Sequence, residues 1–306
     1  MDMQSAPIYE FLLWNNCNNN CKFCHQKANR EKYPGKFTDD FGKHKSISLV
    51  SEFIQAGSIA PGSHFLLMGG ELFDTKLSTR TEAAFLHLAI QVKTMMLTGL
   101  VGYFYLNSNL LYEDRTLLDK FLAIFKEVDL LKRVLFTTSY DFGPGFRFES
   151  KKDRAIAESN MLNISRDYPD MRRTANCILT AEACTFLSNN REYLGYFKQE
   201  FGFDINLIPY IRLGEGMAAT RSTILSTLMD LDITSPGILE RVKTTHTASP
   251  VKILWEFDGE NLAYVTAKNA NCGHSINFTK VYSDSVQCFI CDIIQIYKLT
   301  YQSGLK

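Results

Sequence analysis

The chain has 306 residues, of which 45% are hydrophobic, 12% aromatic and 22% charged, and 33 basic residues balance 33 acidic ones. This composition excludes a disordered or collagen-like chain, and zero net charge argues against a protein that coats nucleic acid. The N-terminus lacks the basic start of a signal peptide, and no apolar stretch is continuous enough to span a bilayer. We therefore expect a cytoplasmic protein with no membrane partner.

Apolar runs typical of β-strands recur along the first two thirds of the chain, with helical patterns between them. The predicted strands are Ile8–Trp14, His64–Met68, Val101–Leu106, Arg133–Thr138, Thr174–Leu179 and Phe203–Pro209. The predicted helices between them are Ile47–Ala56, Leu77–Leu97, Glu113–Val128, Lys151–Ile164 and Ala181–Phe201. This alternation predicts an α/β fold with a mainly parallel sheet. On such sheets ligands bind at the carboxyl ends of the strands.

The pattern changes after about residue 212. Two helical stretches follow, Met217–Leu231 and Ile238–Thr244, and then two strand-like runs, Val251–Phe257 and Asn261–Ala267, flank Asp258-Gly259. An Asp-Gly pair between such runs predicts a β-hairpin. We therefore divide the chain into a domain over residues 1–215, a helical connector over 216–250 and a C-terminal hairpin and helix module over 251–306.

Three cysteines follow the first predicted strand at C-x3-C-x2-C spacing: Cys17, Cys21 and Cys24. Three thiolates in one short loop can hold a [4Fe–4S] cluster and leave one iron open for an exogenous ligand. Zinc is the structural alternative, but it needs a fourth protein ligand nearby.

The cysteine motif, with Phe23 just before its last cysteine, resembles that of the radical S-adenosylmethionine (SAM) enzymes. The second strand ends in Gly69-Gly70-Glu71, which is similar to the Gly-Gly-Glu motif of the same family. The resemblance covers roughly residues 7–212. It implies a partial (β/α)6, TIM-like barrel, to which the C-terminal module is appended.

The resemblance also implies cofactors and site residues. The glycines and Glu71 are expected to hold the methionyl part of SAM. The ribose and carboxylate of SAM are expected to contact polar residues at the ends of the third and fourth strands, namely Asn107, Ser139 and Asp141. The reaction is a reductive cleavage of SAM to a 5′-deoxyadenosyl radical, which abstracts a hydrogen from substrate, as in oxidoreductases or isomerases of this family. A small flavodoxin- or ferredoxin-type protein would supply the electron.

A second cysteine cluster lies near the C-terminus: Cys272, His274, Cys288 and Cys291. A Cys3His set is typical of structural zinc. The hairpin followed by C-x2-C is also similar to the twitch and SPASM extensions of radical SAM enzymes, which hold auxiliary iron–sulfur clusters. Zinc, an auxiliary iron–sulfur cluster and the absence of a metal all remain open here.

The substrate is open as well. A nucleotide or nucleic-acid base, a peptide and a small amine are all compatible with the resemblance. A different class of function is a non-enzymatic iron–sulfur or zinc protein for electron transfer or partner binding. That alternative predicts metal sites fully ligated by protein and no cleavage of SAM.

Overall fold

The computed structural model describes residues 6–19, 21, 39–73, 77–142, 147–209, 221–238, 249–257 and 262–270. The strands are β1 Ile8–Leu12, β2 Ser63–Met68, β3 Val101–Asn107, β4 Val134–Ser139, β5 Arg172–Leu179, β6 Asp204–Pro209, β7 Ser249–Phe257 and β8 Leu262–Ala270. The helices are α2 Asp40–Gln55, α3 Thr79–Leu97, α4 Thr116–Lys126, α5 Lys151–Asp167, α6 Ala181–Asn189, α7 Tyr193–Phe201 and α8 Arg221–Thr234, with a 3-10 turn η1 at Leu131–Arg133.

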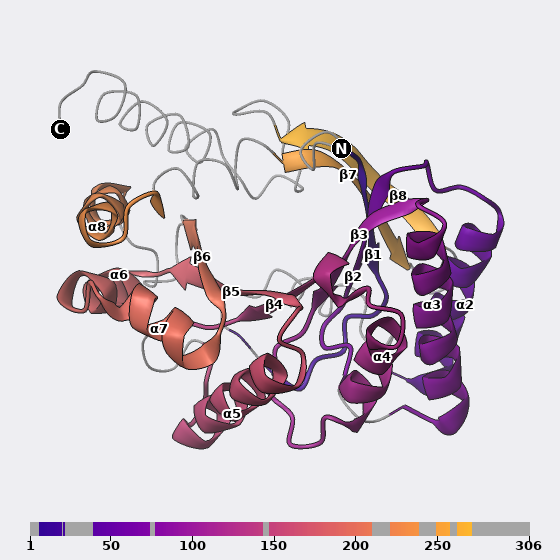
Figure 1. Ribbon diagram of the computed structural model, residues 1–306, viewed down its shortest axis with the longest axis horizontal. Coiled ribbons are helices and arrows are strands. Elements are labelled where there is room, and N and C mark those ends of the chain that lie inside the picture. Colours follow the sequence, from indigo (N-terminus) through magenta and orange to yellow (C-terminus); the bar gives the residue numbers. More distant parts are fainter. Residues whose placement is uncertain are drawn as a thin grey trace.

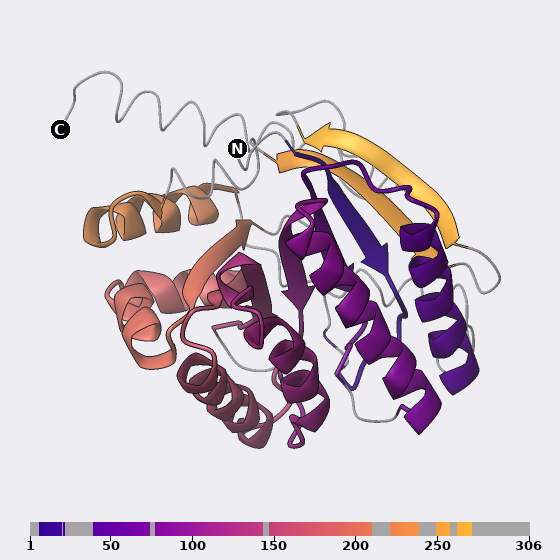
Figure 2. The same ribbon diagram turned by 45° about the vertical axis from the view of Figure 1, so that its right-hand side comes forward.

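The strands form one sheet in the order β6-β5-β4-β3-β2-β1-β7-β8. Neighbours from β1 to β6 are parallel, which confirms the predicted α/β fold and its six strands. Sequential parallel strands joined by right-handed crossovers place their helices on one face of the sheet. Figures 1 and 2 show α2 to α5 along the convex side of the curved sheet.

The predicted C-terminal hairpin is confirmed, since β7 and β8 are antiparallel. Its turn, Asp258-Gly259, lies outside the described residues. β7 also pairs in parallel with β1, with Glu10 opposite Leu254. The hairpin therefore extends the main sheet at the edge opposite β6. Most of the predicted helix Ile238–Thr244 lies outside the described residues.

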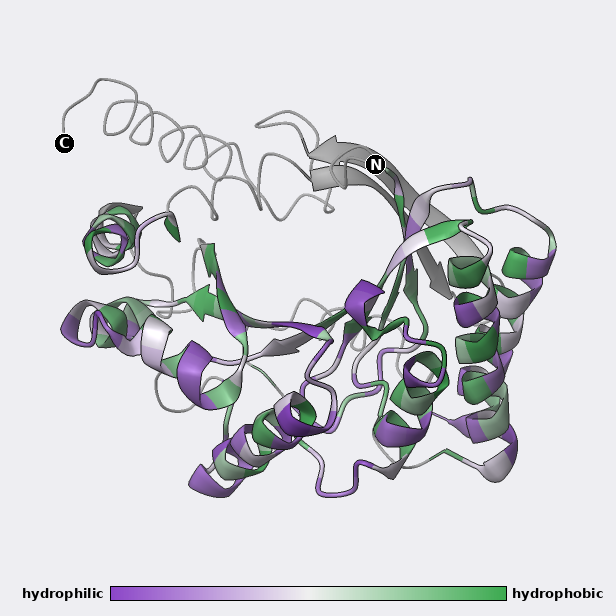
Figure 3. Cartoon of the chain, viewed as in Figure 1, coloured by the Kyte–Doolittle hydropathy of each residue, from purple (hydrophilic) through white to green (hydrophobic). Residues whose placement is uncertain are grey.

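Side-chain caps fix where several helices begin. Asp39 accepts a hydrogen bond from Gly42 N before α2, and Ser150 forms a reciprocal capping box with Asp153 before α5. Such caps satisfy backbone N–H groups that have no partner in the first turn. Figure 3 shows apolar and polar residues interleaved along α2 to α5, as expected for helices with one buried face.

The prediction of one helix over Ala181–Phe201 is wrong, because two helices occupy this range. α6 ends at Asn189, because the backbone of Asn190 leaves the helical region with φ −133° and ψ 59°, and α7 begins at Tyr193. Asn190 favours such a break because its side chain competes for backbone hydrogen bonds, here by donating to Phe186 O.

Phenylalanine rings fill the space between the sheet and the helices. Phe11 stacks on Phe65 at 4.9 Å between centroids, and Phe104 stacks on Phe125 of α4 at 5.2 Å. All four side chains are fully buried. Burying each one contributes about 1.5–3 kcal/mol. This apolar layer holds the strands in register and so fixes where their carboxyl ends lie.

Among the described residues, no helix combines the length and the apolar character that a bilayer crossing requires.

Candidate functional site

The loop that carries the first cysteines runs beside the end of β2. Gly70 N donates to Trp14 O at 2.7 Å, and Glu71 N donates to Asn16 O at 2.8 Å. These bonds continue the β1–β2 pairing beyond the strands. The segment just before Cys17 is therefore fixed to the predicted Gly-Gly-Glu motif at the carboxyl edge of the sheet.

The two glycines of that motif are required by this close approach. A Cβ atom on Gly70 would collide with the backbone of Asn16, and one on Gly69 would lie 2.9 Å from Trp14 O. Real Cβ atoms essentially never come that near to a carbonyl oxygen. The structure thus explains the glycines by the backbone of the cysteine loop, while their contact with a methionyl group stays a prediction.

Glu71 is 2% exposed, and its carboxylate joins the ends of β2 and β3. Oε1 accepts from Ser108 Oγ at 2.9 Å and from Phe73 N at 3.0 Å, and Oε2 accepts from Asn109 N at 2.6 Å. A buried carboxylate is stable when several donors satisfy it. In the described structure Glu71 therefore links the residues that follow β2 to those that follow β3. Its predicted contact with SAM stays a prediction.

Tyr112 extends this network away from Glu71. Its hydroxyl lies 2.9 Å from Ser108 Oγ. Burial, together with the nearby Glu71 carboxylate, raises the pKa of Tyr112 well above its ordinary value. The hydroxyl is therefore protonated at neutral pH, and either hydroxyl can donate in its contact with Ser108.

Cys17 is reached by side chains from the end of β3. Asn109 Nδ2 lies 3.5 Å from Cys17 Sγ and 2.8 Å from Asn18 Oδ1, and Asn19 N donates to the same sulfur at 3.4 Å. Asn18 in turn donates to Leu111 O at 2.6 Å. The asparagines around Cys17 therefore bind its loop to the residues that follow β3.

Cys21 is reached from the end of β4. Arg147 Nη1 donates to Cys21 Sγ at 3.6 Å, and Arg147 Nε pairs with Asp141 Oδ2 at 2.9 Å. The other oxygen of Asp141 accepts from Ile178 N at 3.1 Å. Asn19 Nδ2 donates to Arg147 O at 3.0 Å. Asp141 thus holds the arginine through one oxygen and β5 through the other, and its predicted contact with SAM stays a prediction.

The donors around the two sulfurs fit thiolate ligation. Cysteine ligates metals as the thiolate, and N–H groups and positive charge stabilise that form. Cys17 and Cys21 both accept from nitrogen donors. Cys24 and Phe23 lie outside the described residues. Within the described ranges, no three His, Cys, Asp or Glu side chains gather as a metal site.

Neutral polar side chains line the concave face near the same edge. Asn107 and Ser139 alternate with the buried residues Leu106 and Thr138, so they point to the opposite face from the helices. Ser139 is in register with Asn176, whose Oδ1 accepts from Asn206 Nδ2 at 3.0 Å. This row offers hydrogen-bonding groups beside the cysteine loop. The predicted roles of Asn107 and Ser139 in binding SAM are not tested by these contacts.

The second predicted metal site lies outside the described residues. Its four residues are Cys272, His274, Cys288 and Cys291. Zinc, an iron–sulfur cluster and no metal therefore remain open for it.

Sequence reasoning did not single out Arg147 or Asn109 as site residues. Arg147 lies between β4 and α5, where an arginine is ordinarily solvated. Asn109 belongs to Asn107-Ser108-Asn109 at the end of β3. The position of Asn109 just after β3 was an available signal, since the ends of parallel strands meet at one edge. Arg147 lies eight positions beyond the end of β4 and carried no such signal.

No family model matches the sequence, and no curated protein aligns with it significantly.

Proposed function

We propose that the chain is a radical SAM enzyme with a partial (β/α)6 barrel, in which Cys17, Cys21 and Cys24 ligate a [4Fe–4S] cluster. One observation carries the proposal. The loop with Cys17 and Cys21 follows β1 and is hydrogen-bonded to residues directly after β2 and β3 and to Arg147 between β4 and α5, at the edge where an α/β sheet binds its ligands. When bound, the reduced cluster and SAM would supply the 5′-deoxyadenosyl radical that abstracts a hydrogen from substrate.

The chain's own residues would bind and orient these groups. The three thiolates would hold the cluster. Glu71 and Asp141 keep the surrounding loops in place, and both would also contact SAM. Phe23 and the backbone of Gly69 and Gly70 would bind the methionyl group. The neutral side chains of Asn107 and Ser139 would offer hydrogen bonds to the ribose and the carboxylate of SAM. Holding reactants in a fixed geometry and excluding water supply much of such an enzyme's rate enhancement.

The remaining parts of the proposal follow the resemblance. A flavodoxin- or ferredoxin-type protein in the cytoplasm donates the electron. The substrate is a nucleotide or nucleic-acid base, a peptide or a small amine. The C-terminal cysteines hold zinc or an auxiliary iron–sulfur cluster.

The test is anaerobic reconstitution of the full chain with iron and sulfide, followed by addition of SAM and dithionite. We expect iron bound at a stoichiometry of at least four per chain and 5′-deoxyadenosine formed only with dithionite present. Changing Cys17, Cys21 or Cys24 to Ser should abolish that product. Cys184→Ser is the matched control, because Cys184 is buried in the helical layer and packs in the apolar core.

Wild-type protein that binds no iron would contradict the proposal. Protein that binds iron but forms no 5′-deoxyadenosine would instead favour the non-enzymatic electron-transfer alternative. Product formation that survives all three Ser substitutions would also contradict the proposal, because the radical chemistry would then not depend on these thiolates.

A further inference from the structure

Two nitrogen donors approach the cysteine sulfurs from different strands of the sheet. Asn109 Nδ2 comes from the residues after β3 and lies 3.5 Å from Cys17 Sγ. Arg147 Nη1 comes from the residues after β4 and lies 3.6 Å from Cys21 Sγ. These contacts give each sulfur a donor that originates far away in the sequence.

Arg147 is held rigidly for this contact. Its side chain is 10% exposed and that of its partner Asp141 is 3% exposed. The second Asp141 oxygen is bound by Ile178 N, and Asn19 donates to the carbonyl of Arg147. Removing such an ion pair from water carries a desolvation penalty, so a buried pair is weak evidence for a role in stability alone. Its position against Cys21 indicates a role at the sulfur.

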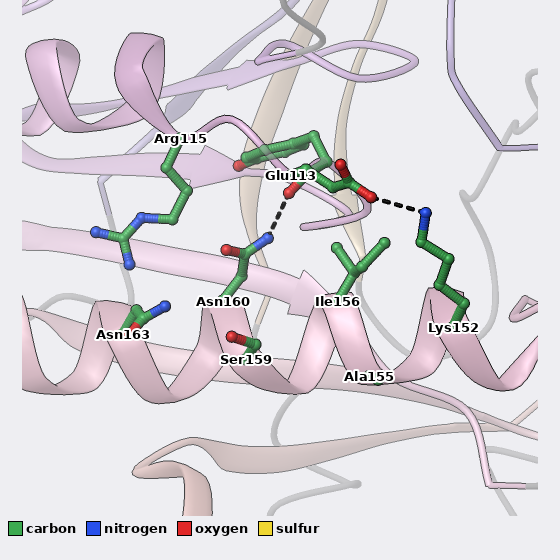
Figure 4. Close-up of a pocket in the computed structure, with 9 residues that line it drawn as sticks. Glu113, Arg115, Lys152, Ala155, Ile156, Ser159, Asn160 and Asn163 are labelled. Atoms are coloured by element: carbon green, nitrogen blue, oxygen red, sulfur yellow. Dashed lines mark hydrogen bonds and ion pairs between the residues drawn. The ribbon is translucent and has the colours of Figure 1, made fainter.

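The segment that carries Asn109 is also held by hydrogen bonds, on both of its sides. On the inner side, its backbone N–H donates to Glu71. On the outer side, Asn160 Nδ2 donates to Leu110 O at 2.9 Å and to Tyr112 O at 2.7 Å. Figure 4 shows Asn160 rising from its helix toward this loop.

Leu110, the residue after Asn109, adopts a left-handed backbone with φ 60° although it is not glycine. This conformation costs about 1–2 kcal/mol for a residue with a Cβ atom. The surrounding hydrogen bonds therefore force a turn that the chain would not adopt alone. Within this turn Asn109 Oδ1 accepts from Leu111 N at 2.7 Å, and Asn109 Nδ2 faces Cys17.

We propose that Arg147 and Asn109 are positioning residues that raise the reduction potential of a cluster held by the cysteine loop. This inference rests on the proposed function. Reduction adds one electron to the cluster, in the test from dithionite, and the charge spreads onto the sulfurs. N–H donors and a positive charge aimed at those sulfurs stabilise the reduced form more than the oxidised form. Both residues thereby make the cluster easier to reduce.

The experiment is a redox titration of the reconstituted full chain, followed by electron paramagnetic resonance. The main variant combines Arg147→Met with Asp141→Asn, which removes the donor at Cys21 and leaves the net charge unchanged. We expect the ratio of reduced to oxidised cluster at a fixed potential to fall about tenfold, a shift of about 59 mV to more negative potential for one electron. Asn109→Leu should lower the ratio about threefold, because it removes a neutral donor.

The matched control is Arg191→Met with Asp230→Asn. This pair also joins an arginine to an aspartate, at 3.4 Å, but its side chains are 46% and 34% exposed. The control should titrate as the wild type does. If the Arg147 variant fails to fold, Asn109→Leu carries the test alone.

If the wild type holds a cluster but neither test variant changes its reduction potential, this inference is overturned and the proposed function stands. An equal change in the control variant would overturn the inference in the same way. Wild-type protein without iron would instead overturn the proposed function, and the inference with it.

Discussion

The helix-covered face of the sheet and its carboxyl edge are stabilised in different ways. On the helix side, phenylalanine rings such as Phe11 and Phe65 stack and are fully buried. At the carboxyl edge, Glu71 and Asp141 are equally hidden from water but are held by hydrogen bonds with fixed directions. Apolar burial is non-directional and depends on area, whereas a buried polar group must keep each partner. Substitutions on the helix-covered face should therefore change stability according to the side-chain volume that they remove. Substitutions at the carboxyl edge should change stability according to the single hydrogen-bonding atoms that they remove.

The largest effect should come from the apolar layer. Phe121 is fully buried and its ring contacts Phe73, Phe85, Phe104 and Phe125. Phe121→Ala should lower the free energy of unfolding by about 3–5 kcal/mol, because it removes apolar contacts and leaves a cavity. Urea unfolding measures this change. Phe41→Ala is the control, since Phe41 is 75% exposed and should change stability little.

The sharpest contrast with that result is Glu71→Gln, which barely changes volume. The amide would place an NH2 group against at least one of the N–H and O–H donors that now bind the carboxylate. We expect a loss of about 2–3 kcal/mol, the value of hydrogen bonds to a charged group. Thermal unfolding measures the loss, and hydrogen exchange at Asn109 N should accelerate.

Glu82→Gln is the matched control for Glu71. Glu82 pairs with Lys120 at 2.7 Å, and the two side chains are 30% and 52% exposed. Exposed pairs contribute about 0–1 kcal/mol. Equal losses in both variants would show that the carboxyl edge does not depend on its buried hydrogen bonds.

A smaller loss should follow from adding one methyl group at the edge. Gly70→Ala places a Cβ atom against the backbone of Asn16, so the cysteine loop must shift. Overpacking of this kind costs about 1–3 kcal/mol. Chemical denaturation measures it.

Gly195→Ala provides the opposite expectation. Gly195 lies within α7 and a Cβ atom there meets nothing within 4 Å. Alanine is a better helix former, so this variant should gain about 0.5–1 kcal/mol. A Gly70→Ala protein as stable as the wild type would show that the loop does not approach the strand as closely as described.

The smallest effect concerns the helix ends, which belong to neither region. The hydrogen bonds from Ser78, and a further one from Thr81, lower the pKa of Asp40 below its ordinary value of 3.8. As the pH falls, Asp40 therefore binds a proton in the unfolded chain at a higher pH than it does in the folded protein. The resulting stability is present above about pH 4 and is lost as the pH falls through the lower folded value.

Asp40→Asn should accordingly flatten the fall in stability between about pH 4 and pH 2, by less than about 1 kcal/mol for this solvent-accessible group. Unfolding free energies measured across that range test the sign. A steeper fall in the variant than in the wild type would contradict it.

Local sequence patterns were enough to predict the alternation of strands and helices and the position of the cysteines directly after the first strand. Apolar periodicity and turn residues act over a few neighbouring positions, so they can be recognised without the fold. The same locality explains the error over Ala181–Phe201, where helical periodicity continues across a break at Asn190.

The side chains that contact the cysteines can be identified only once the strands are assembled into the sheet. Arg147 is 126 positions from Cys21, and Asn109 is 92 positions from Cys17. The pairing of β7 with β1 spans still more of the sequence, since Ile8 lies opposite Lys252. Such contacts arise because parallel strands bring all their carboxyl ends to one edge, and no local pattern encodes which loops will touch there.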